Sequence, residues 1–159
     1  MNKFLNIKGF YFATAILSFF ILLSAFYIEY VLGAEVCRLC LYQRIPYLIA
    51  IFICFLGYNN SKKIIWIYLL TITFLSSLIL SGYHFGIENN IFPEFSGCKT
   101  DNLSIINKED LLNSLNKIMP NCKDITFRIF GLSLATINIF ISGFIMTICI
   151  VFIKNEKNK

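Results

Sequence analysis

Four long apolar runs, each bounded by charged or strongly polar residues, limit what this chain can fold into. A helix needs about 20 mostly apolar residues to cross roughly 30 Å of hydrocarbon. Lipid offers the backbone no hydrogen-bond partners, so such runs must be helical. The pattern predicts membrane-spanning helices over residues 9–28, 43–60, 64–83 and 129–153. We therefore expect an all-α membrane protein, a four-transmembrane-helix bundle that forms a single integral-membrane domain over residues 1–159.

The composition agrees with a membrane environment. Hydrophobic residues make up 57% of the chain and charged residues 14%, whereas soluble domains average about 45–50% and 25%. We expect contact with membrane lipid and no nucleic-acid partner. The first run follows Lys3 and Lys8 and exceeds the roughly 7–15 apolar residues of a signal peptide, so we interpret it as a retained helix rather than a cleaved leader.

Lysine placement predicts the orientation of the bundle. With four spans, three lysine groups fall on one face of the membrane: Lys3 and Lys8; Lys62 and Lys63; Lys154, Lys157 and Lys159. Basic residues favour the cytoplasmic side. We therefore expect both termini in the cytoplasm of a bacterial cell, with the protein in the inner membrane. The outer loops, residues 29–42 and 84–128, would then face the periplasm.

The long second outer loop contains a short helical pattern. Asn107 is a suitable N-cap, and Pro120 ends the pattern. Between them Leu111, Leu115 and other apolar residues recur on one face. Two placements stay open for this short surface helix: on the membrane surface, or across the end of the bundle.

The six cysteines divide into three groups by their position. Cys37 and Cys40 lie in the first outer loop, Cys98 and Cys122 in the second, and Cys54 and Cys149 inside predicted spans. A buried cysteine behaves as a small apolar residue, which is how we interpret the last pair. The two outer pairs would meet the oxidising space in which disulfides persist.

The C-x-x-C pair has features of a reactive dithiol. The attacking species in thiol exchange is the thiolate, so a low pKa favours reaction. Cys40 is expected near the N-terminus of the second span, where the helix dipole favours negative charge, and Arg44 follows four residues later. Arg38 adds positive charge, and Pro46 fits the first helical turn.

Cys98 and Cys122 allow two interpretations. As a structural disulfide the pair would stabilise its loop by about 3 kcal/mol. As a redox disulfide in a long loop, it would accept electrons from a partner and pass them to the C-x-x-C pair. The nearby C-x-x-C pair favours the redox interpretation.

The electrons released by such a pair need an acceptor. The sequence has no G-x-G-x-x-G motif, and Leu41 stands where C-x-x-C-H haem attachment needs histidine. The cysteine spacing is unlike that of zinc or iron–sulfur sites, so no metal is expected. A quinone in the lipid is the remaining two-electron acceptor. Arg44 would contact its carbonyl, and His84, the single histidine, lies at the outer end of the third predicted span.

The sequence C-R-L-C-L-Y-Q-R at residues 37–44 resembles the C-x-L-C-x-x-[EQ]-R signature of the disulfide bond formation protein B (DsbB) family. The resemblance extends over about residues 9–153. It includes the four spans, the second cysteine pair and F-G-L-S at residues 130–133.

The resemblance implies a function and a set of roles. The protein would be a quinone-dependent thiol oxidase that reoxidises a DsbA-like thioredoxin-fold oxidase, using ubiquinone or menaquinone. Cys37 and Cys40 would be the quinone-coupled pair, with Cys40 meeting the quinone. Cys98 would form the mixed disulfide with the partner, and Cys122 would exchange with Cys37. Arg44 and His84 would lie at the quinone.

Two other functions compete with this one. A quinone-coupled reductase of the vitamin K epoxide type carries its C-x-x-C late in the chain, whereas Cys37 and Cys40 come early. A structural membrane protein with two inert disulfides is the non-enzymatic alternative. The reduction potentials of the two pairs would discriminate, because structural disulfides lie below about −300 mV.

Overall fold

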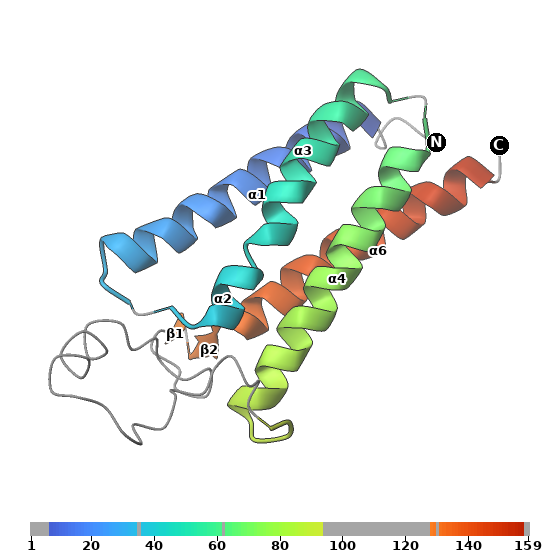
Figure 1. Cartoon of the computed structure of the whole chain (residues 1–159). Coiled ribbons are helices and arrows are strands. Elements are labelled where there is room, and N and C mark those ends of the chain that lie inside the picture. The colour runs from blue at the N-terminus through green and yellow to red at the C-terminus, as the bar shows by residue number, and fades with distance from the viewer. Residues whose placement is uncertain (1–6, 35, 62, 94–127, 130, 158–159) are drawn as a thin grey trace, which may run out of the picture.

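A computed structural model describes residues 7–34, 36–61, 63–93, 128–129 and 131–157 (Figure 1). The described elements are α1 (Ile7–Tyr30), α2 (Arg38–Tyr42), α3 (Ile45–Asn59), α4 (Ile65–Glu88), β1 (Arg128–Ile129), β2 (Leu132–Ser133) and α6 (Leu134–Lys157). Within these residues, four segments are long and apolar enough to cross a membrane, with α2 and α3 together forming the second. The predicted all-α four-span fold is confirmed.

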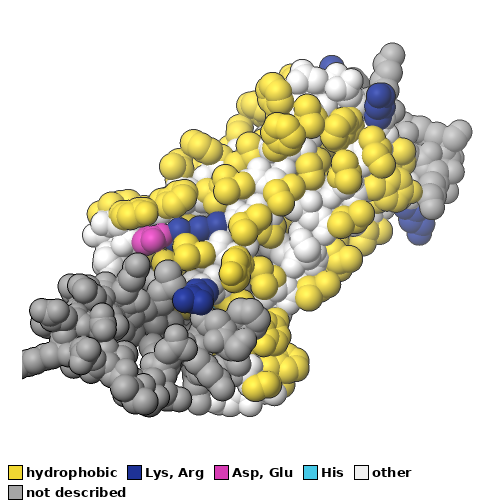
Figure 2. Space-filling view, in the orientation of Figure 1, with side chains coloured by type: hydrophobic (Ala, Val, Ile, Leu, Met, Phe, Trp, Pro, Cys, Tyr) yellow, Lys and Arg dark blue, Asp and Glu magenta, His cyan; other side chains and the backbone are white. Residues whose placement is uncertain are grey.

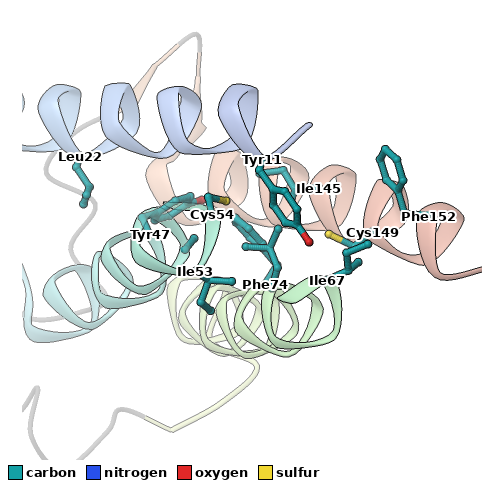
Figure 3. Packing of buried hydrophobic residues seen from close by; sticks show 12 residues of the cluster. Tyr11, Leu22, Tyr47, Ile53, Cys54, Ile67, Phe74, Ile145, Cys149 and Phe152 are labelled. Atoms are coloured by element: carbon teal, nitrogen blue, oxygen red, sulfur yellow. The ribbon is translucent and has the colours of Figure 1, made fainter. Parts of the chain in front are cut away.

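The helices bury a shared core and leave apolar side chains on the outside. Helix α4 packs along α6, α1 packs along α3, and α3 also contacts α4. The core includes Tyr11, Ile67 and Phe74, none of which has exposed surface (Figure 3). Apolar side chains also dominate the outer face between the two ends (Figure 2). In water such a surface would be costly, whereas lipid is a suitable solvent for it.

A close approach between α1 and α3 depends on one glycine. A Cβ atom placed on Gly57 would lie 2.8 Å from the ring of Tyr11. Figure 3 shows the Tyr11 side chain extending from α1 into the core between the other helices. The missing side chain at Gly57 therefore lets the aromatic ring fill the space between the two helices.

Both ends of the bundle are recognisable in Figure 1. The N and C ends and the connection between α3 and α4 lie at one end, and α2 and the β1–β2 hairpin lie at the other. We call the latter the cysteine end, because Cys37 precedes α2 there. This arrangement is the one that an even number of spans requires; which membrane face each end meets remains a prediction.

Helix α6, which corresponds to the fourth predicted span, begins later than the sequence predicts. Residues 128–133 form an antiparallel hairpin in which Arg128 pairs with Ser133, and Gly131 supplies the turn with φ +82°. The Ser133 hydroxyl then accepts the N–H of Thr136 at 3.2 Å, as an N-cap does. The predicted start at residue 129 is therefore wrong, because turn and capping residues inside the apolar run delay the helix to Leu134.

Helix α4, which corresponds to the third predicted span, ends later than predicted, at Glu88 instead of residue 83. The chain then turns back at Asn90, whose φ is 60°, and Ile91 donates its N–H to the Gly86 carbonyl at 2.8 Å. The Phe92 ring occupies the space that a Cβ on Gly86 would need. His84, predicted at the start of a loop, therefore lies inside a helix.

The first predicted loop, residues 29–42, contains the short helix α2. Helix α2 ends at Tyr42, and α3 begins at Ile45 with Pro46 in its first turn, as predicted for this proline. The predicted surface helix over residues 107–119, and both Cys98 and Cys122, lie outside the described residues.

Candidate redox site

The two cysteines of the C-x-x-C pair lie on the first turn of α2. Their sulfur atoms are 3.2 Å apart as free cysteines. Cys37 is the N-cap residue, and its Sγ accepts the backbone N–H of Cys40 at 3.4 Å. The sequence assigned the helix-terminus effect to Cys40. In the structure the sulfur that receives the terminal N–H is that of Cys37.

His84 connects α4 to this pair. Its Nε2 atom lies 3.7 Å from Cys37 Sγ and 3.7 Å from a carboxylate oxygen of Glu88, one helical turn further along α4. Its side chain is almost fully buried, and so is that of Glu88. Cys37 also packs with Leu39 and Ile87 in a small apolar cluster. The imidazole is therefore held against the sulfur in a site from which water is largely excluded.

These contacts favour the thiolate of Cys37. They lower the pKa of its thiol from 9.0 to about 4. The largest cause is the hydrogen bond with Cys40; burial opposes the effect, and a hydrogen bond with His84 adds to it. A thiolate at neutral pH is the nucleophile that disulfide exchange requires.

A chain of buried polar side chains continues from His84 into the bundle. The Gln43 side-chain nitrogen lies 3.0 Å from His84 Nδ1, and Gln43 Oε1 accepts from Asn138 Nδ2 at 3.2 Å. Asn138 Oδ1 in turn accepts the Tyr47 hydroxyl. The sequence analysis missed Gln43, Tyr47 and Asn138. The available signal was a buried amide inside an apolar span, because polar residues there are costly and usually functional.

A pocket lies next to Cys40, between α1, the α2–α3 junction and α6. Its volume is about 180 Å³, and its wall is mostly apolar. The lining residues that carry polar or sulfur atoms in their side chains are Ser24, Cys40, Gln43, Arg44, Tyr47 and Asn138. A dry apolar cavity of about 150 Å³ accommodates a benzene molecule. The pocket therefore has room for one six-membered ring beside the sulfur-bearing residue.

Arg44 is held at the pocket by two contacts. Its guanidinium forms an ion pair with Glu29 of α1 and lies 5.1 Å from the centre of the Phe26 ring. Both partners are on α1, so Arg44 joins the α2–α3 junction to that helix. A fixed cation in an apolar wall is suited to bind a carbonyl oxygen that gains negative charge.

Comparison with known proteins identifies the family. A family model described as disulfide bond formation protein DsbB matches residues 8–152. The chain belongs to the DsbB family. An uncharacterized protein of Rickettsia prowazekii (strain Madrid E) is 31% identical over 133 residues, which cover 79% of this chain and 76% of that protein. Membership of the DsbB family implies an oxidoreductase of membrane disulfide-bond formation, and the four spans agree with a multi-pass membrane protein.

The structure of this DsbB-family chain brings together part of the predicted site. Cys37, Cys40 and His84 converge, and Arg44 lines the same pocket as Cys40. His84 is not among the residues that line this pocket; it contacts Cys37 instead. Cys54 and Cys149 are buried in the bundle core, in agreement with an apolar packing role.

Among the described residues, the DsbB-family site contains three potential metal-binding atoms. Cys37, Cys40 and His84 offer ligand atoms within 4.8 Å of one another. The contacts of Cys37 with Cys40 and with His84 are also those of a reactive dithiol.

Proposed function

We propose that this protein is a quinone-dependent thiol oxidase of the bacterial inner membrane. It would reoxidise a periplasmic DsbA-like thioredoxin-fold oxidase and so support disulfide formation in secreted proteins. The observation that carries the proposal is the position of Cys40. It forms part of the wall of a ring-sized apolar pocket while its sulfur lies 3.2 Å from that of Cys37.

The residues present fit a quinone head group. Arg44 offers a fixed cation for one carbonyl oxygen, and the apolar lining from α1 and α6 suits a ring that arrives from the lipid. When bound, a quinone accepts two electrons and two protons.

The chain's own groups would perform the exchange. One thiol of the partner attacks Cys98 of a Cys98–Cys122 disulfide, and Cys122 leaves as a thiolate. The Cys122 thiolate then attacks Cys37 of the Cys37–Cys40 disulfide, and Cys40 leaves as a thiolate. The partner's second thiol releases the oxidised partner from Cys98, and the Cys98 thiolate displaces Cys37 from Cys122, which restores the loop disulfide and leaves Cys37 and Cys40 reduced. Closure of the Cys37–Cys40 disulfide then releases two electrons and two protons, which matches the acceptor's capacity.

The direct experiment is a reconstituted assay. Purified protein in lipid receives a reduced thioredoxin-fold dithiol protein and a soluble short-chain quinone, and quinone loss is followed by absorbance. Loss should depend on the dithiol protein and should disappear in Cys40→Ser. The matched control is Cys54→Ala, which removes a buried core thiol from the neighbouring helix. Equal rates in Cys40→Ser and the parent, or no quinone loss at all, would refute the proposal.

A second experiment identifies the partner. In Cys122→Ser the free Cys98 thiol should attack the disulfide of the oxidised partner, one partner sulfur should leave as a thiolate, and the mixed disulfide should accumulate because Cys122 is absent to resolve it. Mass spectrometry of the trapped complex would name the partner. A complex that forms equally well in a Cys98→Ser, Cys122→Ser double variant would contradict the assigned role of Cys98.

A further inference from the structure

The buried chain from Tyr47 to Cys37 has a direction that follows from hydrogen-bond chemistry. At one end, His84 Nε2 lies 3.7 Å from the Cys37 sulfur and 3.7 Å from the Glu88 carboxylate, and both groups can accept hydrogen bonds. Two acceptors favour a proton on Nε2. In the neutral imidazole the other nitrogen, Nδ1, then has a lone pair and must receive a hydrogen bond.

The remaining groups satisfy this requirement in sequence. Gln43 presents its NH₂ group to Nδ1, which directs Gln43 Oε1 toward the NH₂ group of Asn138. The Asn138 oxygen accordingly faces hydroxyl donors, that of Tyr47 and that of Ser142 at 3.2 Å. Every amide has its oxygen toward a donor and its nitrogen toward an acceptor, so the chain is consistent from end to end.

We propose that Asn138 is a positioning residue for the redox pair: through Gln43 it fixes the tautomer of His84, so that Nε2–H faces Cys37. The catalytic meaning of this proposal rests on the proposed function. A histidine tautomer is set by the hydrogen bond to its other nitrogen, and the wrong tautomer in a catalytic triad costs about 10⁴-fold in rate.

The burial of Asn138 supports a role beyond helix packing. Its exposed fraction is 7%, and it lies in α6, which faces lipid and the bundle interior. A polar side chain inside a span is costly unless partnered. Charged or titratable groups that face His84 include Cys37, Cys40 and Glu88. Asn138 reaches the imidazole only through Gln43, so its effect is on orientation rather than charge.

The chain contains one histidine, which makes the proposal directly measurable. Protein labelled with ¹⁵N at histidine, reduced and held in nanodiscs, would give one pair of ring nitrogen resonances. At neutral pH these should report a protonated Nε2 and an unprotonated Nδ1. An Nδ1–H tautomer or an imidazolium in the unmodified protein would overturn the proposal without any variant.

Variants test the role of Asn138 itself. Asn138→Leu should produce a mixture of the two tautomers, and Asn138→Asp should reverse the Gln43 amide and move the proton to Nδ1. The matched control is Thr73→Val, an isosteric change at a buried hydroxyl on α4 that bonds to Leu69 of its own helix; its resonances should equal those of the parent. Unchanged resonances in Asn138→Asp would refute the proposal.

The test is separable from the proposed function. The tautomer is read in the dithiol protein without quinone or partner. A protein that shows the expected tautomer but no quinone reduction would refute the function alone. Normal quinone reduction together with an unaltered tautomer in Asn138→Asp would refute the positioning role alone.

Discussion

The Sγ atom of Cys37 lies 3.7 Å from Nε2 of His84, although 47 residues separate the two in sequence. The contact joins the N-cap of α2 to the last turns of α4. It places an imidazole against the sulfur that also receives the helix N-terminal N–H of Cys40. Two different elements thus converge on one sulfur, and the resulting thiolate is open to a direct test.

Alkylation of reduced Cys37 should be nearly independent of pH between 8 and 6. Its pKa is lowered to about 4, so the thiolate persists over this range. An ordinary thiol with a pKa of about 8.5 would lose roughly 100-fold in thiolate over the same two units. The rate at Cys37, resolved by mass spectrometry after iodoacetamide treatment, should fall only as the pH approaches 4. A rate proportional to hydroxide concentration would contradict this prediction.

The same shift predicts how the stability of the reduced protein depends on pH. Between pH 4 and 9 the unfolded thiol binds a proton that the folded Cys37 does not. The free energy of unfolding therefore rises with pH across this range. The contribution of Cys37 is fully present above the pKa of the unfolded thiol and is lost as the pH falls through the pKa of the folded thiol. The oxidised protein, which has no Cys37 thiol, is the control and should lack this slope.

Replacing His84 with Phe should raise the pKa of Cys37 without restoring the ordinary value. The imidazole contributes a hydrogen bond to the Cys37 sulfur, but the hydrogen bond with Cys40, which is the largest cause of the low pKa, remains. The pH at which the alkylation rate of Cys37 falls to half its plateau should rise by roughly one unit from about 4. A midpoint identical to that of the parent would show that His84 does not stabilise the Cys37 thiolate.

Replacing Arg44 should weaken quinone binding more than it affects thiol exchange. In Arg44→Leu the KM for a soluble quinone should rise about tenfold, since a hydrogen bond to a charged group stabilises by about 1.5–3 kcal/mol. Glu29→Gln, which keeps the arginine and removes its ion-pair partner, should change the KM by less than about threefold. Equal KM values for Arg44→Leu and the parent would show that Arg44 does not contact the quinone.

Gly57 and Gly82 form a matched pair for the packing of the bundle. Gly57→Ala should lower the stability by about 1–3 kcal/mol, because the new Cβ would meet the Tyr11 ring at 2.8 Å. Gly82→Ala places its Cβ in open space and should be neutral or slightly stabilising, since alanine is the better helix former. Unfolding of both variants in the same detergent would measure the difference. A neutral Gly57→Ala would contradict the close α1–α3 contact.

The spans could be predicted from the sequence because the membrane imposes a simple rule on length and charge. The helix ends could not, since they depend on local contacts. The hairpin before α6 needs the positive φ of Gly131, and the extra turn of α4 depends on Phe92 packing over Gly86. The hydropathy pattern of the sequence gives no information about either contact.

The site was predictable only in part, for a similar reason. The C-x-x-C motif and Arg44 are contiguous in sequence, so their proximity is local. The contact of His84 with Cys37, and that of Asn138 with Gln43 across 95 residues, arise from how helices pack. A list of polar residues inside apolar spans names candidates for such contacts, but their partners emerge only in three dimensions.

The two anchor points at the cysteine end restrict how far the second cysteine pair can travel. Pro93, whose carbonyl accepts from Tyr83, and Arg128, paired in the hairpin, hold both ends of the intervening segment. Cys98 is five residues from Pro93 and Cys122 six from Arg128, so their reach is at most about 18 and 22 Å. Tethers this short confer effective concentrations in the millimolar range, and a loop thiol freed by a partner would meet Cys37 without a diffusional search.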